Sequence, residues 1–213
     1  RPAEPNKGGN LKNLSGLATL SPFGDVAILQ KKFLPKTGRF EAYGAATGIL
    51  NDVFFNNFGL QGRMAYYFQE RYGIELVGLF LTSAEKDATK DLREKREVIT
   101  SSLVTPKNFI GLDFKWIPIY GKMSYINSRI TPFDLYFSGG LGLTGTNLGT
   151  SEPTLHLGTG QTFALSKAMA ARWDFTWNFF TSNSTAGDGS KSFFNNLYLT
   201  VGMSFFFPEA KYR

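Results

Sequence analysis

The sequence predicts an all-β protein, an eight-stranded antiparallel up-and-down transmembrane β-barrel with an N-terminal arm. Three observations lead to this fold class. Large apolar residues alternate with polar or small ones in eight separate segments, as in strands whose side chains point alternately to two faces. Charged residues inside these segments share one face. The connections between segments are alternately long and short, as in outer-membrane barrels.

The composition excludes several classes of protein. The chain has 213 residues, which suits one domain, and contains 21 Phe, 23 Gly and no Cys, so disulfides and thiolate metal sites are excluded. No apolar run reaches the ~18 residues of a transmembrane helix, but a spanning strand needs only about 9–11 residues, half of them polar. The net charge of +6 comes from scattered basic residues, which argues against nucleic acid and fits membrane lipids as partners.

Three regions are expected along the chain. Residues 1–38 form an N-terminal arm that is partly flexible, residues 39–207 the transmembrane barrel, and residues 208–213 a C-terminal tail. The apolar part of the arm, residues 15–38, is interrupted by Pro22, Gly24 and Pro35. Its periodicity does not distinguish an extended arm or plug, a short helix and an extra strand.

The first three expected strands cover residues 39–50, 58–68 and 74–83. The second alternates most cleanly, whereas in the third Val77 and Leu79 share a face with Glu75, which leaves its facing uncertain. Residues 84–99 follow, with opposite charges spaced four apart, and this spacing predicts an exposed loop with helical tendency.

The remaining five strands are expected at residues 109–118, 133–144, 155–165, 171–180 and 196–207. The first of them can extend through Ser124, because the nearest turn signal is Asn127-Ser128-Arg129. Residues 145–150 and 181–191 are rich in Gly, Ser, Thr and Asn, as long loops are, whereas Ser166-Lys167-Ala168 is a tight connection.

The placement of charge decides which face meets lipid. A soluble barrel would carry its charges outside and its apolar residues inside, but the Trp, Phe and Leu residues are too numerous for so small an interior. We therefore expect lipid on the apolar face and an interior ion network in which three strand cations pair with five carboxylates, with glycines making room for them. The cations are Arg63, Lys115 and Arg172, and the carboxylates are Glu41, Glu75, Asp113, Asp134 and Asp174.

Aromatic residues near the strand ends predict two interfacial girdles. The first is expected to contain Phe68, Tyr72, Trp116, Phe133, Phe205 and Phe207. The second is expected to contain Trp177 and Phe179, together with Phe58 and Phe80.

The closing strand carries the polar residue Thr200, Gly202 two positions later, and then Phe205 and Phe207. This pattern resembles the C-terminal assembly signal of outer-membrane barrels, which implies recognition by the barrel-assembly machinery. The segments Gly38–Glu41, Trp116–Lys122 and Phe133–Tyr136 resemble a family of small outer-membrane β-barrel domains found mainly in delta-proteobacteria, which are OmpA/OmpX-like. The resemblance covers about residues 25–207 and implies the Gram-negative outer membrane, but no activity.

One outward face has unusually small residues, namely Ala42, Gly44, Ala46 and Gly48. Small residues let another chain approach closely within a membrane. We hypothesise a contact here with a sister protomer, which gives a homo-oligomer, or with the arm at residues 15–38. The alternative is a lightly packed lipid face.

No motif identifies an activity. We expect no catalytic residue, cofactor or metal, because no cluster has the spacing of metal ligands. The leading hypothesis is a structural or lipid-interacting barrel with an interior filled by side chains. The alternatives are a lipid-modifying enzyme that uses His156, the only histidine, and a narrow pore.

Overall fold

The computed structural model describes residues 32–87, 89–90, 104–125, 129–183 and 191–209. Expectations for residues 1–31 of the arm, for most of the charged segment 84–99 and for the last four residues of the tail lie outside these ranges. Among the described residues, no helix has both the length and the hydrophobicity to cross a membrane.

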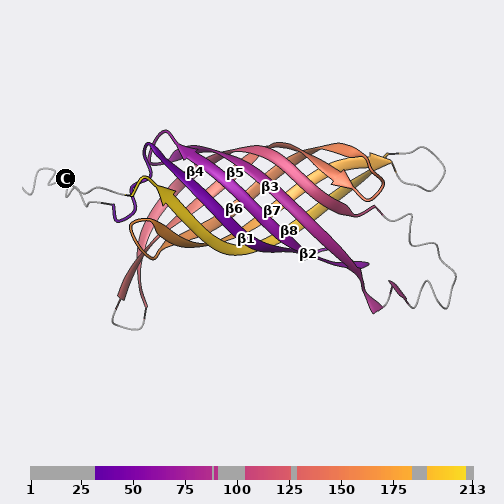
Figure 1. The fold of residues 1–213 in the computed structure, drawn as a ribbon, viewed down its shortest axis with the longest axis horizontal. Helices are drawn as coiled ribbons and strands as arrows, with labels where there is room; N and C mark the ends of the chain where they lie inside the picture. Colours follow the sequence, from indigo (N-terminus) through magenta and orange to yellow (C-terminus); the bar gives the residue numbers. More distant parts are fainter. Residues whose placement is uncertain (1–31, 88, 91–103, 126–128, 184–190, 210–213) are drawn as a thin grey trace, which may run out of the picture. The chain divides into compact units, whose positions relative to one another are not determined.

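Eight strands form one antiparallel meander that closes when β1 pairs with β8, and this confirms the predicted fold class (Figure 1). The strands are β1 (Arg39–Ile49), β2 (Phe55–Tyr67), β3 (Tyr72–Glu85), β4 (Pro106–Tyr125), β5 (Arg129–Thr146), β6 (Ser151–Ala164), β7 (Met169–Asn183) and β8 (Lys191–Phe207). The end of the barrel where β1 begins and β8 finishes is called the terminal end below, and the opposite end the distal end.

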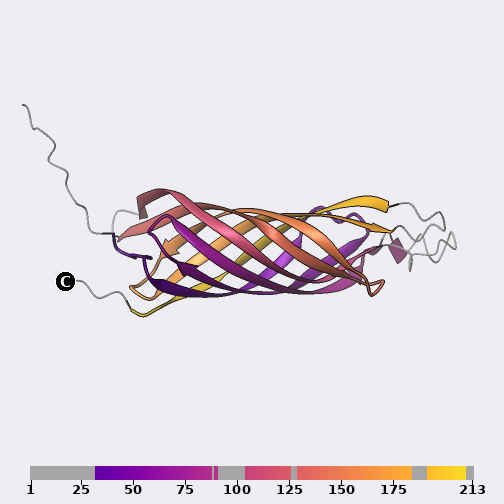
Figure 2. The ribbon, with the colours of Figure 1, turned by 90° about the horizontal axis from the view of Figure 1, so that it is seen from above.

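The register of the strands sets the tilt of the barrel. A continuous row of cross-strand partners contains Glu41, Ala65, Glu75, Asp113, Gly140, His156, Asn178 and Asn196. Glu41 itself pairs with Phe206 of β8, whereas the row that starts at Glu41 reaches β8 at Asn196. One circuit of the barrel therefore shifts the register by ten residues along β8. With a rise of about 3.3 Å per residue and strands about 4.8 Å apart, this stagger gives a tilt of about 40°, which Figure 2 shows as strongly inclined strands.

Several strands are longer than the alternation predicted. β2 begins at Phe55 and β6 at Ser151, in segments expected to be loops, and β3 continues through Glu85. The largest difference is in β8, which begins at Lys191 rather than at the expected Asn196. At the terminal end β4 reaches Tyr125, close to the expected limit at Ser124, and it pairs with β5 from Arg129 after a register shift between Trp116 and Ile119. Alternation of lipid-facing and interior residues ends where the bilayer ends, although backbone pairing continues.

The burial pattern separates two faces. Outward residues are apolar and mostly large, and Leu60 and Leu141 are each 70% exposed. Inward residues are buried, and in β3 these include Glu75, Val77 and Leu79, which settles the facing of that strand.

Two apolar clusters lie inside the barrel. The cluster near the terminal end contains Leu34, Ala65, Tyr67, Ile117, Tyr136, Ala164, Ala170 and Phe206. The cluster near the distal end contains Val77, Leu79, Phe109 and Tyr198, with Ile49 and Leu81 packed against it.

Candidate functional site

Two groups of polar side chains in the interior form the candidate site. The central ion network consists of Glu41, Arg63, Glu75, Lys115, Arg172 and Asp174. The outer polar layer lies next to it on the distal side and consists of Asp113, His156, Thr176, Asn178, Asn196 and Tyr198. All twelve side chains come from inward positions, and eleven of them are buried, with Asn196 half-buried.

Arg172 of β7 holds the central ion network together. Its Nη1 and Nη2 atoms lie 2.8 Å and 3.0 Å from the two oxygens of Glu75, which belongs to β3 on the other side of the ring. Its Nε atom donates to Asp174 at 2.9 Å. The guanidinium also lies over the rings of Tyr43 and Tyr136, with its Cζ atom 4.4 Å and 4.7 Å from their centroids. One side chain therefore links strands across the interior.

The two glutamates are each shared by several donors. Glu41 accepts from Arg172 at 3.2 Å, from Lys115 at 3.3 Å, and from the hydroxyls of Tyr67 and Ser204. Glu75 accepts from Lys115 at 3.2 Å and from Arg63 at 2.8 Å, besides its two contacts with Arg172. Such multiple partners compensate for the loss of water around a buried charge.

Asp134 was expected to pair with a strand cation, but it contacts the arm instead. Its Oδ2 atom lies 2.9 Å from Nζ of Lys36, which is fully buried and lies over the rings of Tyr67 and Phe206. The sequence could not identify Lys36, because the arm lacks the alternation that reveals an inward position.

The residues just before β1 fill the terminal mouth. Leu34 is buried in the terminal cluster, and the backbone amides of Lys36 and Thr37 each donate to Glu70 at 2.9 Å. Arg39 donates to the backbone carbonyls of Pro35, Lys167, Phe206 and Pro208. This segment therefore connects the start of β1 with the end of β8 at the terminal mouth.

Asp113 also differs from its expected pairing. Its Oδ2 atom lies 3.2 Å from Nε2 of His156, and no Lys or Arg lies within 4.0 Å of it in the part of the chain that the structure describes. The imidazole stacks on Phe109 of the distal cluster, with ring centroids 5.0 Å apart. Both residues are buried, and neither has a hydrogen-bond partner of good geometry among the protein atoms.

Inward glycines receive the side chains of their neighbours. A Cβ atom on Gly140 would lie 2.5 Å from Oδ1 of Asp113 and 2.7 Å from its Cα. A Cβ atom on Gly142 or Gly111 would meet the ring of Phe109 at 2.6 Å. The carboxylate and the ring therefore occupy space that only glycine leaves free.

The residues expected in the girdles lie on the outer surface. Tyr72 stacks on Phe114 with centroids 5.8 Å apart, and Phe68 lies 6.4 Å from Tyr72. The other ring pairs are Trp116 with Phe137, Phe133 with Phe163, Trp177 with Phe179, and Phe179 with Phe193. Phe205 and Phe207 at the end of β8 are also exposed, as are Phe58 and Phe80.

The four residues of the expected assembly signal divide between the two faces. Thr200 is buried and shares a hydrogen bond of 2.9 Å with Thr47 of β1. Gly202 packs against Gly44 and Ala45 across the β1–β8 closure. Phe205 and Phe207 point outward.

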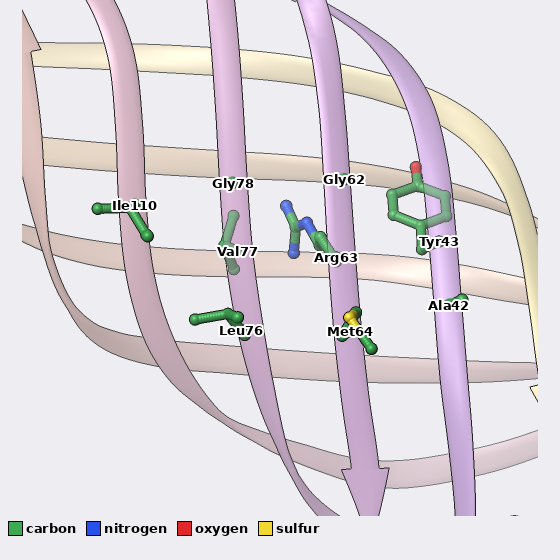
Figure 3. A pocket seen from close by; sticks show the side chains of 9 residues that line it. All are labelled: Ala42, Tyr43, Gly62, Arg63, Met64, Leu76, Val77, Gly78 and Ile110. Atoms are coloured by element: carbon green, nitrogen blue, oxygen red, sulfur yellow. The ribbon is translucent and has the colours of Figure 1, made fainter.

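The small-residue face predicted on β1 extends onto two more strands. Gly44 pairs with Gly62, and Gly62 with Gly78, so three glycines form one row across β1, β2 and β3. A Cβ atom on Gly44 or Gly62 would meet nothing within 4 Å. Figure 3 shows the resulting hollow beside Met64, Leu76 and Ile110.

No group of three or more potential metal-ligating side chains gathers anywhere in the described ranges.

Comparisons with known proteins identify the fold. No family model matches the chain, and no curated protein matches it. Among solved structures, the outer membrane protein OprG from Pseudomonas aeruginosa aligns with a TM-score of 0.51 and 12% identity, over 83% of this chain and 99% of that one. Ail of Yersinia pestis aligns with a TM-score of 0.36 and 13% identity over 80% and 99% of the two chains. Neisserial surface protein A aligns with a TM-score of 0.41 and 9% identity over 80% and 96%.

At 12% identity, the similarity to OprG shows a shared fold and no activity. Together with the closed ring of eight strands and the apolar outer face, it gives the chain the fold of a bacterial outer-membrane β-barrel.

Proposed function

We propose that this protein is a structural, lipid-contacting barrel of the bacterial outer membrane whose interior does not conduct. The outward apolar band and the aromatic rings near both ends support contact with membrane lipids. The pattern of Thr200, Gly202, Phe205 and Phe207 supports delivery by the barrel-assembly machinery. We also propose that the protein is related to the family of small barrels found mainly in delta-proteobacteria. The segments Gly38–Glu41, Trp116–Lys122 and Phe133–Tyr136 support this relationship.

One observation carries the proposal: the interior is occupied by buried side chains. They belong to the terminal cluster, the central ion network, the outer polar layer and the distal cluster, and Tyr198 is part of both of the last two. An eight-stranded barrel is just wide enough for side chains to fill it, which favours a plugged interior over a narrow pore.

Planar-bilayer recording tests the closed interior. Folded protein, identified by its heat-modifiable mobility on a gel, is expected to insert without stable open currents, while an open porin in the same bilayers gives them. Stable open currents from the folded protein would contradict the proposal and favour the narrow pore.

The burial of His156 weighs against the lipid-modifying enzyme. The ring is 1% exposed and lies beneath Phe109, inside the barrel and away from the lipid face. A catalytic base must come within hydrogen-bonding distance of the substrate, directly or through one water. His156→Ala is expected to leave lipid A acylation unchanged in cells that express the protein. A lost modification would revive the enzymatic alternative.

The row of Gly44, Gly62 and Gly78 supports a second proposal, a homo-oligomer formed through β1–β3. The hollow along this row continues beside Ala46, Leu60, Phe80 and Val201. Ridges of a sister barrel could approach the backbone closely at this row, and such approach stabilises contacts in membranes without a hydrophobic driving force.

Cysteine cross-linking tests the oligomer, because the chain has no natural Cys. Ala46→Cys is expected to give a dimer adduct with a bifunctional thiol reagent in native membranes. Leu141→Cys is the matched control, since it is exposed on β5, on the opposite side of the ring. Absence of adducts at both positions would leave lipid as the occupant of the hollow and contradict the oligomer.

A further inference from the structure

The inference concerns Asp113, whose burial is not matched by a counter-charge. Glu41, Glu75 and Asp174 each lie within 4.0 Å of Arg172, and Asp134 lies within that distance of Lys36. Among the buried carboxylates of the described chain, Asp113 alone lacks such a cation, and its only basic partner within this distance is His156. An ionised carboxylate buried in this way would cost several kcal/mol unless it were neutralised.

The neighbouring charges are already engaged. Facing the pair are Arg63 on β2 and Glu75 on β3, which contact each other at 2.8 Å. Lys115 on β4 and Arg172 on β7 are shared between Glu41 on β1 and Glu75, and Asp174 pairs with Arg172. The phenols of Tyr43 on β1, Tyr136 on β5 and Tyr198 on β8 face the same interior. None of these groups supplies Asp113 with a positive charge at contact distance.

Hydrogen bonding between protein atoms around the pair is weak. Neither oxygen of Asp113 has a partner of good geometry, and the contacts of Asn178 with His156 and Tyr198 also fall short of good hydrogen-bond geometry. Asn178 pairs with His156 in the strand register, and Tyr198 follows two residues after Asn196, the partner of Asn178. Buried polar atoms in proteins are almost always hydrogen-bonded, to protein or to ordered water.

We propose that Asp113 and His156 form a buried proton-binding site. The pair holds one proton more than an ionised carboxylate and a neutral imidazole would hold together. Ordered water links the pair to Asn178 and Tyr198. The extra proton lies on the carboxylate or on the imidazole, and either state removes the net negative charge. This site goes beyond the proposed structural role, since it makes the stability of the barrel depend on pH.

The sign of the dependence follows from proton counting. In the unfolded chain above pH about 6.5, an aspartate is ionised and a histidine is neutral, so the two groups bind no extra proton. The folded pair binds one, so stability falls as pH rises in this range, and the unfolding equilibrium constant increases up to about tenfold per pH unit. Below that range the unfolded histidine takes up its own proton, and the dependence weakens.

The test compares two variants of the same chemistry. Unfolding in urea is measured at several values between about pH 7 and pH 9 for the wild type, Asp113→Asn and Asp174→Asn. Asp113→Asn is expected to abolish the pH slope without loss of stability at the upper end. Asp174→Asn is expected to be less stable and to keep the slope. Equal slopes in the wild type and Asp113→Asn would overturn the proposal.

Spectroscopy of the wild type gives an independent answer. Because His156 is the only histidine, its ring ¹⁵N shifts report directly whether it is an imidazolium. If it is neutral, infrared spectra are expected to show the C=O stretch of a protonated carboxylic acid that Asp113→Asn removes. Should that variant fail to fold, His156→Gln is expected to shift the band by changing its hydrogen-bond partner. A neutral ring without such a band would refute the site.

Discussion

The central ion network and the outer polar layer are built from buried polar side chains in the same barrel, yet they differ in how their atoms are paired. In the network, Glu75 alone contacts three cations, and Arg172 contacts three carboxylates. In the outer layer, Asp113, His156 and Asn178 have no hydrogen-bond partner of good geometry among the protein atoms.

The difference teaches that burial alone does not make a polar residue structural. A group with several protein partners fixes the strands that carry it, whereas a group without them needs water or a proton. The network is therefore expected to contribute specificity and rigidity, and the outer layer to tolerate substitution by apolar residues. Substitutions at matched positions can break or sharpen this contrast.

Arg172→Leu is expected to have the largest effect. It would leave Glu41, Glu75 and Asp174 with too few cations, and breaking a buried ion cluster in this way costs about 3–5 kcal/mol. Urea unfolding followed by tryptophan fluorescence measures the loss. Arg71→Leu, at an exposed turn, serves as the control and should change stability by less than about 0.5 kcal/mol. Equal losses of stability for the two substitutions would show that the network contributes no more to stability than an exposed arginine does.

Gly140→Ala is expected to have an intermediate effect. The new methyl group would meet the backbone of Leu112 and the side chain of Asp113, and overpacking of this kind costs about 1–3 kcal/mol. Gly62→Ala is the matched control on the outward face, where a Cβ atom meets nothing within 4 Å. Its stability should remain equal to that of the wild type or rise slightly. If Gly140→Ala were equally harmless, Asp113 would have room to move.

Asn178→Leu should have the smallest effect. The amide has no hydrogen-bond partner of good geometry, only poorly aligned contacts with His156 and Tyr198, so its replacement by an apolar group of similar size should cost less than about 1 kcal/mol. The same unfolding assay applies, with Asp174→Asn as the comparison from the paired network. A loss as large as that of Asp174→Asn would show that Asn178 holds partners as firmly as the network does.

The sequence predicted the fold because facing in a strand depends only on parity. Because Arg63 and Asp174 are expected to point inward, every second residue of their strands is expected to point inward too. The number of strands and the outward aromatic residues followed in the same way. Not all strand ends did, since β8 begins at Lys191, before the alternating segment that starts at Asn196.

The sequence predicted most of the cations and carboxylates that meet inside the barrel, but the individual pairs could not be predicted. Arg172 contacts Glu75 because β3 and β7 lie across the ring, and that distance depends on the stagger of the strands rather than on sequence order. Asp113 and His156 come together over Gly140, which lies on the strand between theirs. Lys36 escaped prediction because it precedes the first strand.

The contacts of Glu41 have a consequence for the order of assembly. This residue enters with the first strand, but its partners come from β2, β4, β7 and β8, and Ser204 lies near the end of the last strand. A partly assembled sheet therefore holds a carboxylate whose full set of donors does not yet exist, beside an unpaired strand edge. The pairing of β1 with β8 supplies the missing donors and the missing strand partner together. The hydrogen bonds of Glu41 are therefore complete only when the last strand is in place.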